Sequence, residues 1–124
     1  MDIRFTQREL DVMTVLWDRG PSTVAEVQSA LDDDLAYNTV LTILRILKDK
    51  GHVSHTEEGR AHRYAPEVER IDAGDSALRR ITQRLFSGSP ELVLTRLVED
   101  ESLSDDELQR MSDLLAERLK GRKG

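Results

Sequence analysis

The sequence contains no cysteine, which excludes disulfide bonds, thiolate metal ligands and a cysteine nucleophile. Aromatic side chains make up only 4% of the 124 residues, so the core must be built from leucine, isoleucine, valine and alanine. No apolar run approaches the length that crosses a bilayer, and the N-terminus lacks the basic-then-apolar pattern of a signal peptide. These absences favour a small helical protein in the cytoplasm, with one compact domain or a domain and an appended element.

The net charge of −6 is unusual for a protein that binds DNA, but the charges are unevenly distributed. Residues 1–34 carry three arginines against eight acids, a balance of −5. Residues 35–63 carry five basic side chains against three acids, a balance of +2. The local potential at a contact surface matters more to a polyanion than the total charge does. Residues 35–63 are therefore compatible with DNA binding. The acidic total charge predicts that non-specific DNA binding is weak at physiological salt.

Two capping boxes, in which a threonine precedes a glutamate by three positions, open helices near the N-terminus. The box at Thr6 predicts a helix to about Arg19, and the box at Thr23 predicts a short helix to about Leu31. The first helix has an apolar face that we expect to be buried, formed by Leu10, Met13, Leu16 and Trp17.

The third predicted helix spans about 36–50 and has two distinct faces. Its apolar face should pack on the first two helices and contains Val40, Ile43, Leu44 and Leu47. Its opposite face is polar and contains Asn38, Thr42 and Arg45, with Thr39 beside them. Gly51 supplies the C-terminal stop.

After Gly51 the pattern changes from helical to extended. Residues 52–55 and 61–65 are predicted as two strands around a turn at 57–59. Arg60 and Arg63 flank the second strand, with His62 between them. Three helices and this hairpin predict a winged helix-turn-helix domain over residues 1–66, in a mainly α protein with a small β-hairpin.

Beyond residue 66 the sequence predicts three more helices, over 71–86, from Pro90 after the N-cap Ser89, and from a capping box at Ser104. They hold many large aliphatic side chains without an evident core of their own, which indicates burial against a second copy. We therefore predict a helical dimerisation region over 67–120 and a frayed tail over 121–124. The predicted dimer contacts are Leu92, Leu94, Leu97, Leu108, Met111, Leu115 and Leu119.

The polar face of the third helix and the hairpin hold the candidate DNA-binding residues. Asparagine can pair with adenine, arginine with guanine or a phosphate, and threonine with a thymine methyl group or a phosphate. An isolated helix face of this kind would more often be merely solvated, and a charged hairpin edge can simply discourage sheet pairing. Together they favour DNA contact, by Tyr37, Asn38, Thr39, Thr42, Arg45, Arg60, His62 and Arg63. For Tyr37 a packing role is as plausible, and for Tyr64 we favour packing.

Other chemistry is less well supported. His52 and His55 would point to opposite faces of a strand, so we expect no metal site, and we expect no cofactor. Asp32, Asp33 and Asp34 are expected to cap the following helix and to stay solvated. No paired acid and base can be placed, so we expect no enzymatic activity. The main alternative to DNA binding is a winged helix that binds another protein, which the acidic net charge would suit.

As a set, these segments resemble the penicillinase repressor family, which includes BlaI, MecI and the copper-responsive CopY branch. Residues 6–17 resemble the first helix of that family, and 35–51 its recognition helix. Residues 59–66 resemble its wing, and 85–94 its C-terminal dimerisation helices. The resemblance implies a homodimeric transcriptional repressor that binds a pseudo-palindromic DNA operator.

The resemblance also implies that family members differ in the signals that release them from DNA. Members paired with a β-lactam sensor, a membrane sensor-protease that acts indirectly, are cleaved near the segment that corresponds to residues 94–97. The staphylococcal members carry an Asn-Phe bond there, and this chain has Thr95 and Arg96. The copper-responsive branch uses C-terminal cysteines, so copper sensing is not expected here.

Overall fold

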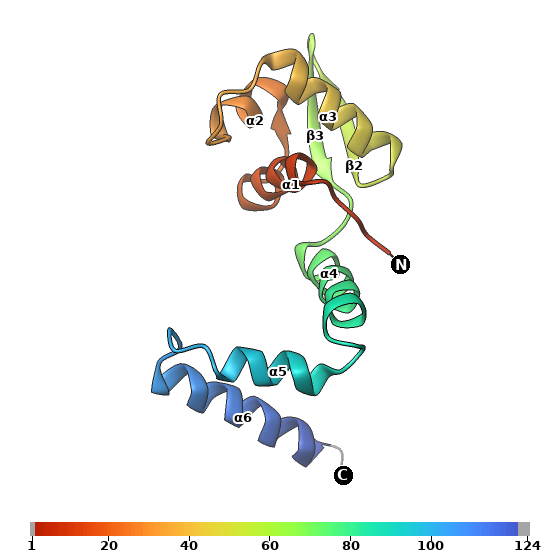
Figure 1. Cartoon of the computed structure of the whole chain (residues 1–124). Helices are drawn as coiled ribbons and strands as arrows, with labels where there is room; N and C mark the ends of the chain where they lie inside the picture. Colours follow the sequence, from red (N-terminus) through yellow and green to blue (C-terminus); the bar gives the residue numbers. More distant parts are fainter. Residues whose placement is uncertain (1, 122–124) are drawn as a thin grey trace. The chain divides into compact units, whose positions relative to one another are not determined.

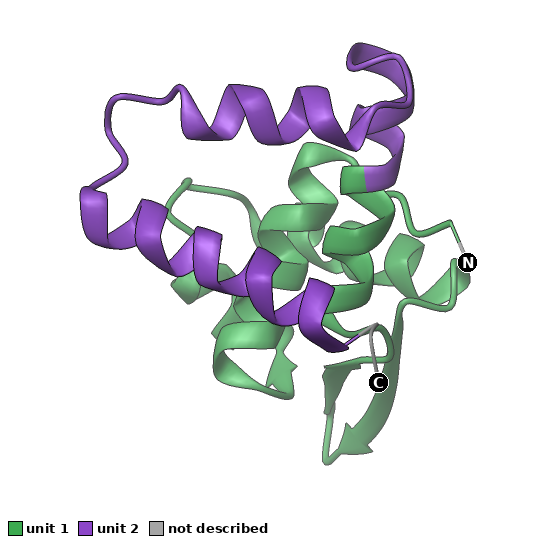
Figure 2. Cartoon of the chain, turned by 90° about the horizontal axis from the view of Figure 1, so that it is seen from below, with its two compact units in different colours: residues 1–78 green, residues 79–124 purple. Residues whose placement is uncertain are grey.

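The computed structural model of the protein describes residues 2–121 and divides into two compact units, one ending at Leu78 and one beginning at Arg79 (Figure 2). The first unit contains helices α1 (Gln7–Arg19), α2 (Val24–Ala30) and α3 (Tyr37–Asp49), a small sheet, and the start of α4 (Arg70–Leu85) (Figure 1). The second unit contains the end of α4, α5 (Pro90–Val98) and α6 (Asp105–Gly121). The fold is the predicted one, mainly helical with a winged helix-turn-helix in the N-terminal part.

Both predicted capping boxes form. The Thr6 hydroxyl accepts from the amide of Glu9 at 3.2 Å, and the Thr6 amide donates to the Glu9 carboxylate at 2.7 Å. Thr23 and Glu26 make the same pair of hydrogen bonds at 3.2 and 2.9 Å. Each box satisfies amides that have no partner within the helix, which explains why α1 and α2 begin where the sequence indicates. Gly51, with φ +81°, follows the end of α3 as predicted.

The hairpin of β2 (Val53–Glu58) and β3 (Ala61–Pro66), which we call the wing, belongs to a three-stranded antiparallel sheet. The third strand is β1 (Ser22–Thr23), and the strand order is β1, β3, β2. The sequence-based prediction of two strands missed β1, because two residues are too few to show an alternating pattern. The predicted turn was also wrong. Glu57 and Glu58 pair with His62 and Ala61, so the turn lies at Gly59 and Arg60.

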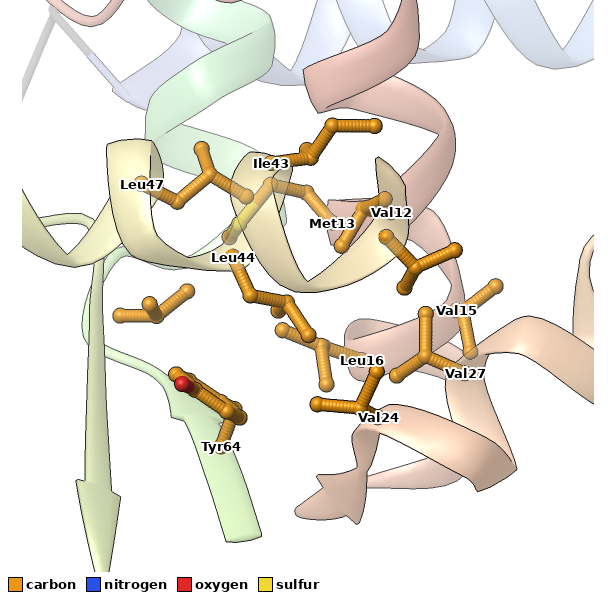
Figure 3. Packing of buried hydrophobic residues seen from close by; sticks show 12 residues of the cluster. Val12, Met13, Val15, Leu16, Val24, Val27, Ile43, Leu44, Leu47 and Tyr64 are labelled. Atoms are coloured by element: carbon orange, nitrogen blue, oxygen red, sulfur yellow. The ribbon is translucent and has the colours of Figure 1, made fainter. Parts of the chain in front are cut away.

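The core of the first unit is aliphatic and is shared by α1, α2, α3 and the sheet (Figure 3). The predicted buried face of α3 is confirmed, since Val40, Ile43, Leu44 and Leu47 are at most 9% exposed. Tyr64, on β3, is also buried at 2% exposure, as predicted for a packing residue.

The predicted buried face of α1 is confirmed at Met13 and Leu16, which are fully buried, and was wrong at Leu10. Leu10 of α1 is 45% exposed, whereas Glu9 is 4% exposed. The Lys50 ammonium lies 3.0 and 2.8 Å from the two Glu9 carboxylate oxygens and compensates this buried charge. Burial alone would raise the pKa of Glu9, but hydrogen bonds from Lys50 and Thr6 and the charge of Lys50 lower it overall.

The first unit extends past the predicted domain boundary at residue 66. Ala73 and Ser76 of α4 are buried, and the Ser76 hydroxyl accepts from the amide of Ile3 at 3.1 Å. The Trp17 indole donates to the Val68 carbonyl at 2.9 Å, and the Arg70 guanidinium lies 5.4 Å from the Trp17 ring centre. These contacts fix the first half of α4 on the winged helix.

The second unit begins its helices as predicted. The Ser89 hydroxyl accepts from the amide of Leu92 at 3.2 Å, and the Ser104 hydroxyl accepts from the amide of Glu107 at 3.1 Å. Neither α5 nor α6 has a buried residue in the single chain. Of the predicted frayed tail, Gly121 is the last residue of α6, and 122–124 lie outside the described residues. No helix within residues 2–121 combines the length and apolar character needed to span a membrane.

Candidate nucleic-acid interface

The outer face of α3 is polar and accessible. Tyr37, Asn38, Thr39, Thr42 and Arg45 are all exposed, opposite the buried face that packs on the core. The Thr42 hydroxyl donates to the Asn38 carbonyl at 2.8 Å, which turns its hydroxyl toward the helix. In the described part of the chain, no hydrogen bond or ion pair engages the side chains of Asn38 and Arg45. These side chains can therefore reach a ligand without first breaking an internal contact.

Lys48 was not among the predicted site residues, although it lies on α3 one turn beyond Arg45. It is exposed, and its positive charge is one of the causes that lower the pKa of His55 on β2. Lys50, two residues later, is held by Glu9. In the sequence, Lys48 and Lys50 both fall in the last turn of the helix and look equally available to a ligand. The sequence cannot show that Lys50 is engaged, because its partner Glu9 lies on α1.

The two wing arginines differ in their surroundings. Arg60 is exposed at the hairpin turn, and among residues 2–121 no partner engages its guanidinium. Arg63, on β3, is bound within the protein: it donates to Glu58 at 2.6 Å, to Glu26 at 3.0 Å and to the Pro21 carbonyl at 3.0 Å. The hydrogen bond to Glu58 is the main cause that raises the pKa of Arg63, and the charge of Glu26 adds to it. Arg63 thus joins both strands of the wing to the start of α2.

His55 and His62 lie on one face of the hairpin with their rings stacked. Their ring centres are 4.5 Å apart and the ring planes differ by 9°. Partial burial is the main cause that lowers the pKa of His55, and the charges of Lys48 and His62 lower it further. His62, a predicted DNA contact, is exposed, and its Nε2 lies 3.9 Å from the Glu57 carboxylate.

Two other predictions concern the surroundings of α3. Tyr37 is 48% exposed at the first position of α3, so packing does not account for its whole side chain. The prediction that an aspartate of 32–34 caps α3 is wrong. The N-cap is Ala36, without a side-chain hydrogen bond, and Asp33 instead forms an ion pair with Arg8 of α1. The connection between α2 and α3 is long enough to turn these acids away from the helix start.

No group of three potential metal ligands assembles within residues 2–121. His52, the third histidine, packs its ring against Phe5 with ring centres 5.0 Å apart, apart from the stacked pair.

A short helix α2, a helix α3 with an accessible polar outer face, and an adjoining β-wing define the chain as a winged helix-turn-helix protein of the kind that docks on duplex DNA. The chain belongs to the penicillinase repressor family, whose family model matches residues 5–117.

Similar proteins carry repressor and regulator names. The chain is 37% identical to the transcriptional regulator BlaI of Mycobacterium tuberculosis over 118 residues, which cover 92% of this chain and 84% of the relative. It is 27% identical to the penicillinase repressor of Bacillus licheniformis over 122 residues, covering 97% of this chain and 95% of that protein.

Solved structures match the winged helix. The DNA-binding domain of the repressor BlaI superposes with a TM-score of 0.52 at 30% identity, covering 58% of this chain and 90% of that domain. The monomeric form of Bacillus licheniformis BlaI in complex with the blaP half-operator superposes with a TM-score of 0.50 at the same identity and coverage. A MarR family protein from Bacillus stearothermophilus matches 98% of this chain and 78% of its own with a TM-score of 0.53 at 17% identity, and shares the fold alone.

Proposed function

We propose that this protein is a transcriptional repressor that binds an operator in duplex DNA through α3 and the wing. The accessible outer face of α3 is the observation that carries this proposal, because the side chains of Asn38 and Arg45 are not engaged within the described residues. The relative from Bacillus licheniformis is named a penicillinase repressor, and the monomeric form of BlaI from that organism is solved with the blaP half-operator. A repressor of this kind acts by occupying DNA and carries out no catalysis.

Base recognition would fall to α3 in the major groove. Asn38 and Arg45 supply the bidentate groups that distinguish adenine and guanine, and each good bidentate pair contributes about 1–3 kcal/mol of base discrimination. Thr42 offers a methyl group to thymine, while Tyr37 and Thr39 flank the face and can reach the sugar–phosphate backbone. Backbone contacts fix the register on the duplex, and α3 then supplies the sequence preference.

The wing would hold the backbone beside the groove. Arg60 is the best candidate for a phosphate contact, since its guanidinium is exposed at the hairpin turn and is not paired. His62 adds an exposed imidazole on the same hairpin. We assign Arg63 an indirect role, because binding a phosphate would require it to leave Glu58 and Glu26.

The repressor would act as a homodimer joined by its C-terminal helices. Four predicted contacts are strongly exposed in the single chain: Leu92 at 47%, Leu97 at 52%, Leu115 at 50% and Leu119 at 66%. Leu94, Leu108 and Met111 are half-buried. Burying these side chains against a second copy would remove apolar surface from water and so stabilise the dimer. The dimer would place two winged helices on successive major grooves, about 34 Å apart.

Release by proteolysis would require a local change in α5. Thr95 and Arg96, in the segment where relatives are cleaved, lie inside that helix. The Thr95 hydroxyl donates to the Glu91 carbonyl at 2.8 Å, and Arg96 pairs with Glu99 at 3.2 Å. Because proteases bind extended chains, a sensor-linked protease would cut here only after α5 opens.

Selection of bound duplexes from a random DNA library, with purified full-length protein at near-physiological salt, tests the proposal. Enrichment of an inverted repeat with half-sites about one helical turn apart is the expected result. Binding without an enriched motif would reduce the proposal to backbone recognition. No binding even at low salt would overturn it in favour of a winged helix that binds another protein.

A further inference from the structure

The stacked histidines lie on the wing, whose strand β2 contacts α3. In the register of the hairpin, His55 pairs with Tyr64 and Glu57 pairs with His62, so alternation places all four side chains on one face of the wing. The rings of His55 and His62 stack diagonally across the two strands, with their centres 4.5 Å apart. The wing thus presents a paired imidazole surface next to the proposed recognition helix.

The charged groups around this pair come from both elements that meet here. The charge of Lys48 on α3 lowers the pKa of His55, and the charge of Arg45 on α3 opposes the rise in the pKa of Tyr64 that burial causes. On the wing, Glu57 lies across from His62 with a side chain that is 79% exposed. The charged groups near the histidine pair are therefore two cations, Lys48 and Arg45, and one acid, Glu57, whose side chain is free to point into solvent.

One imidazole nitrogen lacks a partner in the protein. The Nδ1 atom of His55 is buried and makes no hydrogen bond within the described part of the chain. A buried polar atom without a partner is uncommon, because leaving it unsatisfied costs free energy. A ligand that binds this face of the wing can supply a partner for this nitrogen, directly or after the ring turns.

We propose that His55, His62 and Lys48 form a phosphate-binding site for the DNA backbone, and that the histidine pair takes up a proton when DNA binds. This inference rests on the proposed function and adds a ligand group and a pH dependence to it. Lys48 supplies a permanent positive charge, and His55 adds a second positive charge when a nearby phosphate favours its protonation.

The direction in which DNA affinity changes with pH follows from the charges near His55 and His62. In the free protein, partial burial and the neighbouring charges of Lys48 and His62 disfavour protonation of His55 and outweigh the opposing charge of Glu57. A phosphodiester carries a negative charge and reverses this balance, so the pKa of His55 is higher in the complex. Protons are then bound more tightly in the complex than in the free protein. DNA affinity must therefore rise as the pH falls and weaken as the pH rises, by up to about tenfold per pH unit for each proton taken up.

The composition makes proton uptake straightforward to assign. The chain has three histidines and no cysteine, so histidines are the only side chains that ordinarily titrate between pH 6 and 8. His52 packs on Phe5 and supplies a matched control. His62 is exposed, so a substitution there removes an imidazole at little risk to folding.

The experiment is isothermal titration of the full-length protein with a duplex that carries the selected inverted repeat, at pH 6.5, in two buffers of different ionisation enthalpy. We expect net proton uptake and an affinity that decreases from pH 6 to pH 8. His55→Gln and His62→Gln should each reduce the uptake and flatten the pH dependence, whereas His52→Gln should leave both unchanged. Lys48→Gln should flatten the slope of log affinity against log salt by about 0.9, as expected for one lost phosphate contact.

The outcomes separate this inference from the proposed function. Tight binding without proton uptake, or uptake that persists in both His55→Gln and His62→Gln, would overturn the phosphate site and leave the repressor assignment intact. No DNA binding at any pH would overturn both. If His55→Gln alters the circular dichroism spectrum, His62→Gln decides the question.

Discussion

Replacing Arg60 and Arg63 separately with alanine should distinguish a residue that contacts DNA from one that shapes the wing. By position in the sequence the two are equivalent, since they lie three residues apart on the same hairpin and each could bind one phosphate. In the structure Arg60 is exposed and unengaged within the described residues, whereas Arg63 is 32% exposed in its side chain and bound to Glu26 and Glu58. The two substitutions should therefore change different quantities.

For Arg60→Ala the expected change is in the salt dependence of binding. Each phosphate that a cationic side chain neutralises contributes about 0.9 to the slope of log affinity against log salt. Between 50 and 200 mM salt, a fourfold change, one such contact accounts for about 3.5-fold of the loss in affinity. Arg60→Ala should lower the affinity, flatten the slope by about 0.9 and leave the sequence preference unchanged.

For Arg63→Ala the slope should stay at the value of the unsubstituted protein. The substitution removes the hydrogen bonds to Glu58, Glu26 and the Pro21 carbonyl, and it leaves two carboxylates without their cation. The wing and the start of α2 are then less firmly joined, so we expect a lower thermal midpoint and weaker operator binding at every salt concentration.

The assay is fluorescence anisotropy of a labelled operator duplex at five salt concentrations, combined with thermal unfolding followed by circular dichroism. Arg4→Ala is a matched control, because Arg4 is an exposed arginine on the N-terminal segment that pairs with Asp2. If Arg63→Ala flattens the slope as much as Arg60→Ala does, then Arg63 leaves its internal partners on binding and the assignment of its role is refuted. If neither variant changes the slope, the wing does not contact the backbone.

Three further outcomes follow from the same structure. Arg45→Ala should weaken operator binding and relax the preference at one base position by about 1–3 kcal/mol, and unchanged selectivity in a repeated library selection would remove Arg45 from the site. Glu9→Gln should destabilise the first unit by about 1–3 kcal/mol at neutral pH, since the buried carboxylate loses its charged contacts with Lys50. The pKa of Glu9 is lowered from 4.5, so its stabilisation is present above that pH and is lost as the pH falls below it. Urea unfolding of both proteins should therefore converge in acid, and a constant difference would contradict the role of that charge. A chain ending at Leu78 should fold, because it keeps Ala73 and Ser76, and should be monomeric by light scattering with much weaker operator binding; a dimer would refute the assignment of dimerisation to the C-terminal helices.

The sequence by itself determined the elements whose causes are local. The capping boxes at Thr6, Thr23 and Ser104 predicted where α1, α2 and α6 begin, because the hydrogen bonds that start a helix join residues three positions apart. Gly51 marked the end of α3, because its φ of +81° suits glycine. The helical period separated the polar face of α3 from its buried face, and so predicted most of the candidate interface.

Tertiary structure alone decided which charged side chains are available. Lys50 is bound to Glu9, 41 residues away in the sequence, and Arg63 to Glu26, 37 residues away, so no local pattern could mark them as engaged. The same contacts explain why Glu9 is buried and Leu10 is exposed, against the apolar pattern of α1. The stacking of His55 on His62 likewise depends on the register of two strands. Local chemistry sets where helices begin and end, but the availability of a side chain for DNA depends on partners that only folding brings within hydrogen-bond distance.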